Sequence, residues 1–331
     1  MTVFLVFSCN NGTKVKYIPK SNGNINTVSV IMPMKYWKND LGKIVKKVFS
    51  QEFKGLPQQE PIFNINFIPL GAFSGFARES RNVVLMQVDS VKSYYVEKNR
   101  YASPQLVFNI KAPNELEILK EFNNKKDKIM GSIKNNELIE KRRRMGLSRM
   151  NTSELKSSLA IDLLIPSVYK VFLNNKKQNN IWIQKETKKG SINIVVQDLM
   201  VYDEISNYYD LNKVIELRDS IGKKFIPGRN PDSYMITEKA YEPYIRRTKV
   251  KGFEAVETRG TWELTNDFMA GPFVNYIIRD TINGRNLLLD GFVFSPSSLK
   301  RDMIFELESI FKSIRVINNK KKKTSSSIIG I

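Results

Sequence analysis

The clearest alternation of apolar and polar positions lies within residues 257–302. Residues 274–279 and 286–294 are runs of β-branched, aromatic and aliphatic side chains, which is typical of strands. They flank Asn283-Gly284, a dipeptide that tolerates the positive φ angles of a two-residue type I′ turn. This pattern predicts a β-hairpin, and apolar residues at helical spacing predict a helix over residues 298–314.

The N-terminal half predicts a β-α-β unit followed by further strands. Val28, Val30 and Met32 alternate with polar residues, and residues 40–53 carry apolar positions at helical spacing that Gly55 ends. A strand at 63–67 follows. Further strands are predicted at 83–88 and 105–110, and a long or paired helix at 114–145.

The C-terminal half repeats this theme with strands at 160–165, 181–187 and 192–202 and a helix at 211–222. Residues 223–252 hold several prolines and glycines, which predicts a long ordered loop or a lid. We therefore predict an α+β fold of two sandwich-like domains, mostly antiparallel sheets with helices packed on one face. The predicted division is 1–24 as signal remnant and tether, 25–150 and 151–317 as domains, and 318–331 as a disordered basic tail.

The amino-acid composition gives the chain a strong positive charge. The 331 residues include 53 Lys and Arg against 33 Asp and Glu, a net charge of +20. Such a charge favours nucleic acid or an anionic membrane as a partner. We interpret most of it as a solvated basic surface, because the charge is scattered and Lys, Asn and Ile are abundant together. The run Lys141-Arg142-Arg143-Arg144 closes a predicted helix, where the helix dipole itself favours cations.

The scarcity of histidine and cysteine limits the catalytic mechanisms that the chain could use. The sequence contains no histidine and a single cysteine, Cys9, which excludes Ser-His-Asp and Cys-His catalysis and a disulfide within the chain. No catalytic, cofactor-binding or metal-ligating residue is predicted, and the chain is interpreted as more consistent with a non-enzyme. A carboxylate-dependent hydrolase is the enzymatic alternative, but no spacing selects a pair among the available carboxylates, Asp198, Asp203, Glu204 and Asp290.

The residues Val6-Phe7-Ser8-Cys9 resemble a bacterial lipobox, in which the cysteine is acylated and becomes the mature N-terminus. The preceding apolar run is short and no basic residue precedes it, which suggests that the natural start lies upstream of Met1. Polar residues 10–24 would then form a tether. The alternative is a buried first strand in which Cys9 is inert.

Several spaced motifs resemble one family. They are IPGRNPDSYMIT at 226–237, RGTWE at 259–263, MAGPFVNY at 269–276 and GFVFSPSSLKRD at 291–302, with SNGNIN at 21–26, GLPQQEP at 55–61 and Arg81-Asn82 nearer the N-terminus. Over residues 20–315 the chain resembles the uncharacterised Bacteroidetes lipoproteins grouped as domain of unknown function 4837. The resemblance implies a signal peptide, a lipobox and lipid anchorage at Cys9. It implies no activity, ligand or catalytic residue.

Candidate ligand-facing residues lie in these motifs. Arg259 and Glu263 share one face of a predicted strand and Trp262 lies on the other, so a guanidinium, a carboxylate and an indole are available to a peptide or sugar. Arg229 and Tyr234 complete the candidate set. A cross-strand salt bridge beside a core tryptophan explains the same pattern without a ligand.

The sequence therefore predicts a cell-envelope lipoprotein, lipid-anchored on the periplasmic face or the outer membrane, that serves as an accessory or interaction component with an unknown envelope protein partner. The alternative is a binding module for an anionic glycan, peptide or lipid head group. Cytosolic nucleic-acid binding is a third hypothesis, which requires that no signal exists. The sequence specifies neither a ligand nor an oligomeric state.

Overall fold

A computed structural model of the chain describes residues 17–318 and separates into two compact units. The first unit is Met1–Lys43 with Asn66–Lys125, and the second is Ile44–Ile65 with Lys126–Ile331. Helices and strands are interspersed in both, which confirms the α+β class. The predicted acylation site Cys9 and nearly all of the predicted basic tail lie outside the described residues.

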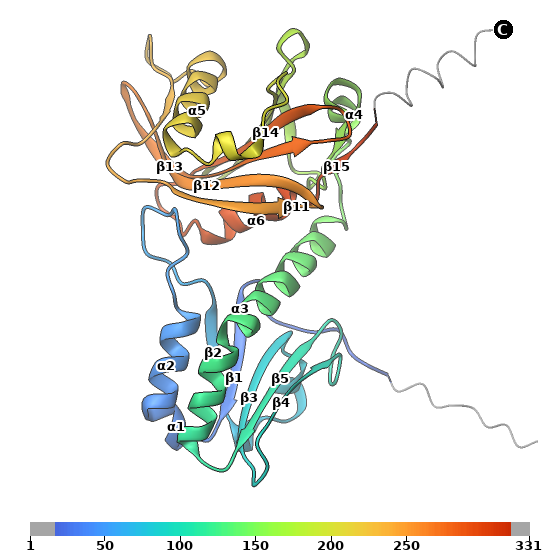
Figure 1. The fold of residues 1–331 in the computed structure, drawn as a ribbon, viewed down its shortest axis with the longest axis vertical. Helices are drawn as coiled ribbons and strands as arrows, with labels where there is room; N and C mark the ends of the chain where they lie inside the picture. Colours follow the sequence, from blue (N-terminus) through green and yellow to red (C-terminus); the bar gives the residue numbers. More distant parts are fainter. Residues whose placement is uncertain (1–16, 319–331) are drawn as a thin grey trace, which may run out of the picture. The chain divides into compact units, whose positions relative to one another are not determined.

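The first unit is built on a five-stranded sheet of order β2-β1-β3-β5-β4 (Figure 1). The pairs β1–β3 and β3–β5 are parallel, whereas β4–β5 is antiparallel, so this sheet is mixed. Two helices follow β1, and short 3-10 helices η1 and η2 lead into β3. The elements in this part of the chain are β1 (Thr27–Met32), α1 (Met34–Lys38), α2 (Asp40–Phe49), β2 (Asn64–Pro69), η1 (Leu70–Ala72), η2 (Gly75–Glu79), β3 (Asn82–Val88), β4 (Ser93–Lys98), β5 (Leu106–Ala112) and α3 (Glu115–Met145). Helix α2 from Ile44 and helix α3 from Lys126 belong to the second unit.

The predicted β-α-β unit and the long helix are present. Leu41, Val45 and Phe49 of α2 are buried at helical spacing, as the apolar pattern predicts. The helix ends at Phe49 and not at residue 53, because the backbone N–H of Phe53 donates to Glu60 O instead of continuing the helix.

Backbone pairing begins earlier than predicted. Ser103 N donates to Pro19 O at 2.8 Å and Ser21 N donates to Ser103 O at 3.0 Å. The buried guanidinium of Arg81 donates to the carbonyl oxygens of Gly23 and Asn24. Residues 19–24, which the sequence places in the tether, therefore belong to the folded unit.

The second unit contains an eight-stranded antiparallel sheet of order β10-β12-β13-β14-β9-β8-β7, with β11 also paired to β12. A two-stranded sheet joins β15 to β6. The elements are α4 (Ser153–Leu159), β6 (Ile161–Asp162), β7 (Lys170–Asn175), η3 (Lys176–Gln178), β8 (Asn180–Thr187), β9 (Gly190–Asp198), η4 (Ile205–Tyr208), α5 (Leu211–Phe225), β10 (Met235–Thr237), β11 (Tyr244–Val250), β12 (Phe253–Leu264), β13 (Asp267–Asp280), β14 (Arg285–Phe294), α6 (Arg301–Phe311) and β15 (Arg315–Val316).

The eight-stranded sheet carries a helix on each face, whereas helices on one face were predicted (Figure 1). Successive residues of β14 show this directly. Asp290 accepts from Arg218 of α5, while Gly291 lies against Leu307 and Phe311 of α6. Because successive side chains of a strand point to opposite faces, α5 and α6 cover opposite sides.

The predicted hairpin is confirmed as the antiparallel pair β13–β14, but its two-residue turn is wrong. Asp280 pairs with Arg285, so four residues form the turn, and Gly284 has φ +64°. The Asp280 carboxylate accepts from the backbone N–H groups of Ile282 and Asn283, which stabilises the longer turn.

The predicted loop over residues 223–252 is also wrong in part. Helix α5 continues to Phe225, and β10 and β11 both pair with β12. Their strand pattern is weak in the sequence because β10 has three residues and β11 is mostly exposed.

Candidate functional site

Arg259 lies on β12 with its guanidinium buried on the side of the sheet that α6 covers. Its Nε donates to Glu257 Oε1 at 2.6 Å, and its terminal nitrogen donates to Glu308 Oε2 at 2.6 Å. Burial alone would lower the pKa of Arg259, but Glu308 and Glu257 raise it well above its ordinary value. Arg259 is thus a permanent buried cation that joins a strand to a helix.

Both carboxylates have further partners, and together these side chains form what we call the Arg259 network. Glu308 accepts from Lys312 at 2.7 Å and forms an ion pair with Lys134 at 3.1 Å. Glu257 accepts from Arg246 and from the Tyr276 hydroxyl, each at 2.6 Å. The network comprises Lys134, Arg246, Glu257, Arg259, Tyr276, Glu308 and Lys312, so four cations surround two carboxylates.

The two carboxyl groups are held ionised. Burial alone would raise the pKa of Glu257, but Arg259 and Arg246 outweigh it and lower that pKa to about 2. Burial likewise opposes ionisation of Glu308, and Lys134, Arg259 and Lys312 nevertheless bring its pKa well below the ordinary value. Burial raises the pKa of the Tyr276 hydroxyl, and the two glutamates raise it further.

A second buried carboxylate lies on the same helix. Glu306 forms ion pairs with Lys141 at 2.7 Å and Lys185 at 3.0 Å, and it accepts a hydrogen bond from the Tyr169 hydroxyl at 2.8 Å. Burial would raise the pKa of Glu306, but Lys141 and Lys185 lower it to about 2. Glu306 therefore stays ionised at pH values where a free glutamate has already taken up its proton.

These contacts favour a positioning role for the buried glutamates. A general acid needs a raised pKa near the working pH, whereas Glu257, Glu306 and Glu308 have lowered ones. Removing one partner of a buried ion pair is strongly destabilising. The network therefore fixes α6 to the sheet and to residues of α3.

Sequence analysis missed Glu306 and Glu308, although a signal was present. Both lie inside the apolar run of α6, at positions where a helix with a polar face would not place them. Glutamate is almost never fully buried without a partner. Two such residues in an apolar helix therefore indicate buried ion pairs, but the partners come from distant segments that the pattern does not reveal.

The start of α6 is stabilised by one of the motifs of the family resemblance. Glu60, in the GLPQQEP segment, is buried and accepts from the backbone N–H groups of Lys300 at 2.6 Å and Arg301 at 3.0 Å. A carboxylate at this end satisfies free N–H groups and complements the helix dipole. This motif thus has a structural role in holding α6.

The run of four cations at the end of α3 is engaged within the protein. Lys141 pairs with Glu306, Arg142 donates to Lys312 O, and Arg143 and Arg144 pair with Glu140. Burial would raise the pKa of Glu140, but the two arginines lower it to about 2.

The carboxylates considered for hydrolysis are not brought together as a pair. Each has a separate partner: Asp198 pairs with Arg285, Asp203 accepts from Tyr208, Glu204 pairs with Arg279, and Asp290 pairs with Arg218.

Trp262 lies on the opposite side of β12, in the core beneath α5, and is 2% exposed. Its indole N–H donates to Val293 O at 3.2 Å, and its ring centroid is 5.5 Å from that of Phe292. Phe292 in turn lies 6.1 Å from Trp182, whose ring is 4.5 Å from that of Phe172. These rings form a row that runs from the core to the exposed Phe172 of edge strand β7.

The remaining candidate residues are nearer the surface. Arg229 is largely exposed and forms two hydrogen bonds with the Asp267 carboxylate, each 3.1 Å. Tyr234 is half-buried, with Lys223 Nζ 5.5 Å from its ring centre. Glu263, also half-buried, pairs in register with Ile236. Of the five candidate residues, Arg259 and Trp262 are thus buried on opposite faces of β12, and the other three lie near the β10–β12 end of the sheet. A ligand-facing role for these residues stays a prediction.

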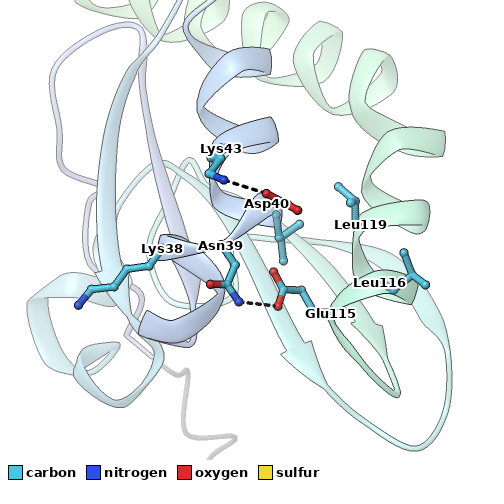
Figure 2. Close-up of a pocket in the computed structure, with 8 residues that line it drawn as sticks. Lys38, Asn39, Asp40, Lys43, Glu115, Leu116 and Leu119 are labelled. Carbon is cyan, nitrogen blue, oxygen red and sulfur yellow. Dashed lines mark hydrogen bonds and ion pairs between the residues drawn. The ribbon is translucent and has the colours of Figure 1, made fainter.

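A surface pocket of about 420 Å³ in the first unit lies where α1 ends and α2 and α3 begin (Figure 2). Asn39 Nδ2 donates to Glu115 Oε2 at 3.1 Å, and Lys43 pairs with Asp40 at 2.9 Å. Figure 2 shows Leu116 and Leu119 of α3 completing the lining. Asp40 and Glu115 already place carboxylates at the two helix starts, so the pocket offers an anion no free helix end. The sequence gives no signal for it, because its walls are more than 70 residues apart.

Other pockets lie in the second unit and are lined by both polar and apolar side chains. One of about 450 Å³ includes Glu204, Arg247 and Glu254, and one of about 420 Å³ lies beside Phe172. Within residues 17–318, no group of three or more Asp, Glu or Cys side chains is placed to hold a metal ion. None of the helices described there is long and apolar enough to cross a membrane.

Comparison with known proteins gives families without an assigned activity. No curated protein matches the chain. Among solved structures, LpqN of Mycobacterium tuberculosis, described as involved in cell envelope biogenesis, is 13% identical with a TM-score of 0.29; the match covers 47% of this chain and 83% of that one.

Two family matches divide the chain between them. Residues 21–146 match the family described as Domain of unknown function (DUF8532), so the single resemblance inferred over residues 20–315 is corrected for this part. Residues 148–313 match Domain of unknown function (DUF4837), which confirms the resemblance there. Since the latter match spans half of the 331 residues, the chain belongs to the DUF4837 family.

Proposed function

We propose that this protein is a cell-envelope lipoprotein, anchored through acylated Cys9, that acts as an accessory or interaction component. The observation that carries the proposal is the position of the backbone contacts nearest the N-terminus among residues 17–318. Pro19 and Ser21 form hydrogen bonds with Ser103, and Pro19 stands ten residues after Cys9 of the lipobox-like Val6-Phe7-Ser8-Cys9. Ten residues span at most about 35 Å, so an acyl chain on Cys9 would hold the first unit close to a bilayer.

The site geometry supports a role other than catalysis. The most highly charged cluster described is the Arg259 network, in which Glu257 and Glu308 are ionised and paired in the interior. Such groups orient α6 and β12 and present no proton donor to a substrate. The family resemblance to Bacteroidetes lipoproteins supports the location.

Cell fractionation tests the anchor. The fractions are washed in high salt, which screens surface charge and leaves the acyl chain as the attachment, so the wild-type chain is expected to stay in the membrane fraction until detergent releases it. Cys9→Ala removes the only thiol and, in high salt, should move the protein to the soluble fraction. Ser8→Ala keeps a small residue before the cysteine and is the matched control, which should stay with the membrane. A Cys9→Ala protein that fractionates like the wild type would contradict the proposal.

A further inference from the structure

The topology of the first unit gathers three chain segments at one edge of its sheet. Strands β1, β3 and β5 are mutually parallel, so they begin at the same edge. The segments that precede them are residues 17–26, η2 with Ser80, and residues 99–105. We call this region the N-terminal edge surface.

Hydrogen bonds hold the three segments side by side. Residues 19–21 exchange backbone hydrogen bonds with Ser103, and Asn22 N donates to Glu79 O at 3.0 Å. The Asn22 side chain also donates to Phe76 O at 3.4 Å. Asn22 therefore lies directly beside η2, and residues 19–21 lie beside Ser103.

Apolar side chains on this surface point into solvent. Phe76 is 73% exposed, Tyr17 is 84% exposed and Ile18 is 40% exposed. Each of the two segments that lie beside each other through Asn22, residues 17–26 and η2, thus carries exposed apolar side chains. Aromatic side chains are enriched at the boundary between water and lipid, where polar and apolar surroundings meet.

The same surface is basic. Four cations, Lys20, Arg78, Lys98 and Arg100, lie in these segments or at the end of β4, against the carboxylates Glu79 and Glu97. Glu97 is paired with Arg100. Arg78 and Arg100 flank the ring of Tyr101, with guanidinium carbons 5.4 and 5.1 Å from its centre.

We propose that the N-terminal edge surface contacts an anionic phospholipid bilayer, with Phe76, Tyr17 and Ile18 among the head groups and the cations at the phosphates. This inference rests on the envelope location proposed above. The surface lies where the chain leads back to Cys9, so a bilayer that held the acyl chain would be within about 35 Å. One acyl chain binds a membrane reversibly, and a basic, aromatic surface supplies the second contact that stable attachment needs.

The test uses the full chain with Cys9→Ser, so that no acyl group contributes to binding. Phe76→Cys is labelled with an environment-sensitive fluorophore, and Phe268→Cys is the matched control, because Phe268 is a fully exposed aromatic residue of the second unit. Vesicles of phosphatidylcholine are compared with vesicles that also contain phosphatidylglycerol. We expect the label at position 76 to brighten and shift to the blue with the anionic vesicles, and the label at position 268 to remain unchanged.

Vesicle cosedimentation then separates the apolar and charged contributions. Phe76→Ser should weaken binding to anionic vesicles about ten-fold. This corresponds to the lower end of the free-energy range for burying a phenyl side chain. Lys20→Gln with Arg100→Gln should weaken it about twenty-fold, and binding should fall with salt. Phe268→Ser and the pair Lys188→Gln with Lys251→Gln are controls that should bind like the parent protein.

Two results would overturn the inference: no binding to anionic vesicles, or equal responses at positions 76 and 268. Neither result depends on acylation. If Cys9 is acylated in cells and the vesicle contact is missing, the surface proposal fails alone. If Cys9 is not acylated and the contact is present, the lipid anchor fails alone.

Discussion

Trp262 packs in the core of the second unit, where its ring meets Phe292 and its indole N–H donates to Val293 O. Gly271 makes this packing possible, because a Cβ there would lie 1.9 Å from Val293 O and 3.2 Å from the Trp262 indole nitrogen. Trp262→Ala should lower the free energy of unfolding by about 3–5 kcal/mol, since the buried indole would leave a cavity in the core. Urea denaturation measures this, and a variant with unchanged stability but a lost partner would contradict the core assignment.

The sequence indicated part of this residue-level picture. A core tryptophan beside a salt-bridged arginine was one of two readings of the RGTWE segment, because residues at spacing two share a face of a strand. The sequence pattern does not identify the partners of Arg259. Glu257 lies on the same strand, but Glu308 is 49 residues away on α6, and only the crossing of α6 over the sheet brings it to the guanidinium.

Stability should depend on pH through Glu306. Its pKa in the folded protein is about 2, below that of a free glutamate, so ionisation stabilises the fold above about pH 5. That contribution, about 3 kcal/mol, is lost as the pH falls through the range from about 5 to about 2. The urea midpoint should therefore drop on acidification.

Glu306→Gln isolates this contribution. The variant should be less stable than the wild type near neutral pH, because Lys141 and Lys185 lose their charged partner, and its urea midpoint should fall less steeply with acid. Glu216→Gln, on the exposed side of α5, is the control and should follow the wild type. Parallel pH profiles for wild type and Glu306→Gln would contradict the assignment.

At the scale of elements, a glycine of α5 allows this helix to approach β10 closely. A Cβ at Gly222 would lie 2.0 Å from Met235 O, so the helix approaches the strand backbone as closely as it does because no side chain intervenes. Gly131, in α3, meets nothing within 4 Å. The two helical glycines therefore have opposite expected responses to the same substitution.

Gly222→Ala should lower the free energy of unfolding by about 1–3 kcal/mol, because α5 must shift away from β10. Gly131→Ala should raise it by about 0.5–1 kcal/mol, because alanine favours the helix and has open space. Thermal and urea unfolding of both variants provide the comparison. A stabilised Gly222→Ala protein would show that α5 is not held by this close approach.

Elements with strong periodic patterns were predictable, and those defined by partners were not. The β13–β14 hairpin and helices α2, α3, α5 and α6 follow from runs of alternating or helically spaced apolar residues. The sequence pattern predicts a loop where β10 and β11 lie, because these strands are short or exposed and their strand pairing is with β12, which comes later in the chain. The place of α6 opposite α5 depends on chain crossings that periodicity does not encode.

For the whole molecule, the parallel arrangement of β1, β3 and β5 has a consequence that no local motif shows. It brings residues 17–26, η2 and residues 99–105 to one edge, so that Phe76 and Asn22 share a surface. The +20 net charge indicated an anionic partner only in general terms. The topology shows where basic and exposed aromatic side chains coincide next to the segment that leads to Cys9.

The most direct test of lipid anchorage is mass spectrometry of the N-terminal peptide from protein isolated from native membranes. The account predicts a peptide that begins at Cys9 and carries the mass of two or three acyl chains. An unprocessed peptide beginning at Met1, recovered from the soluble fraction, would contradict it.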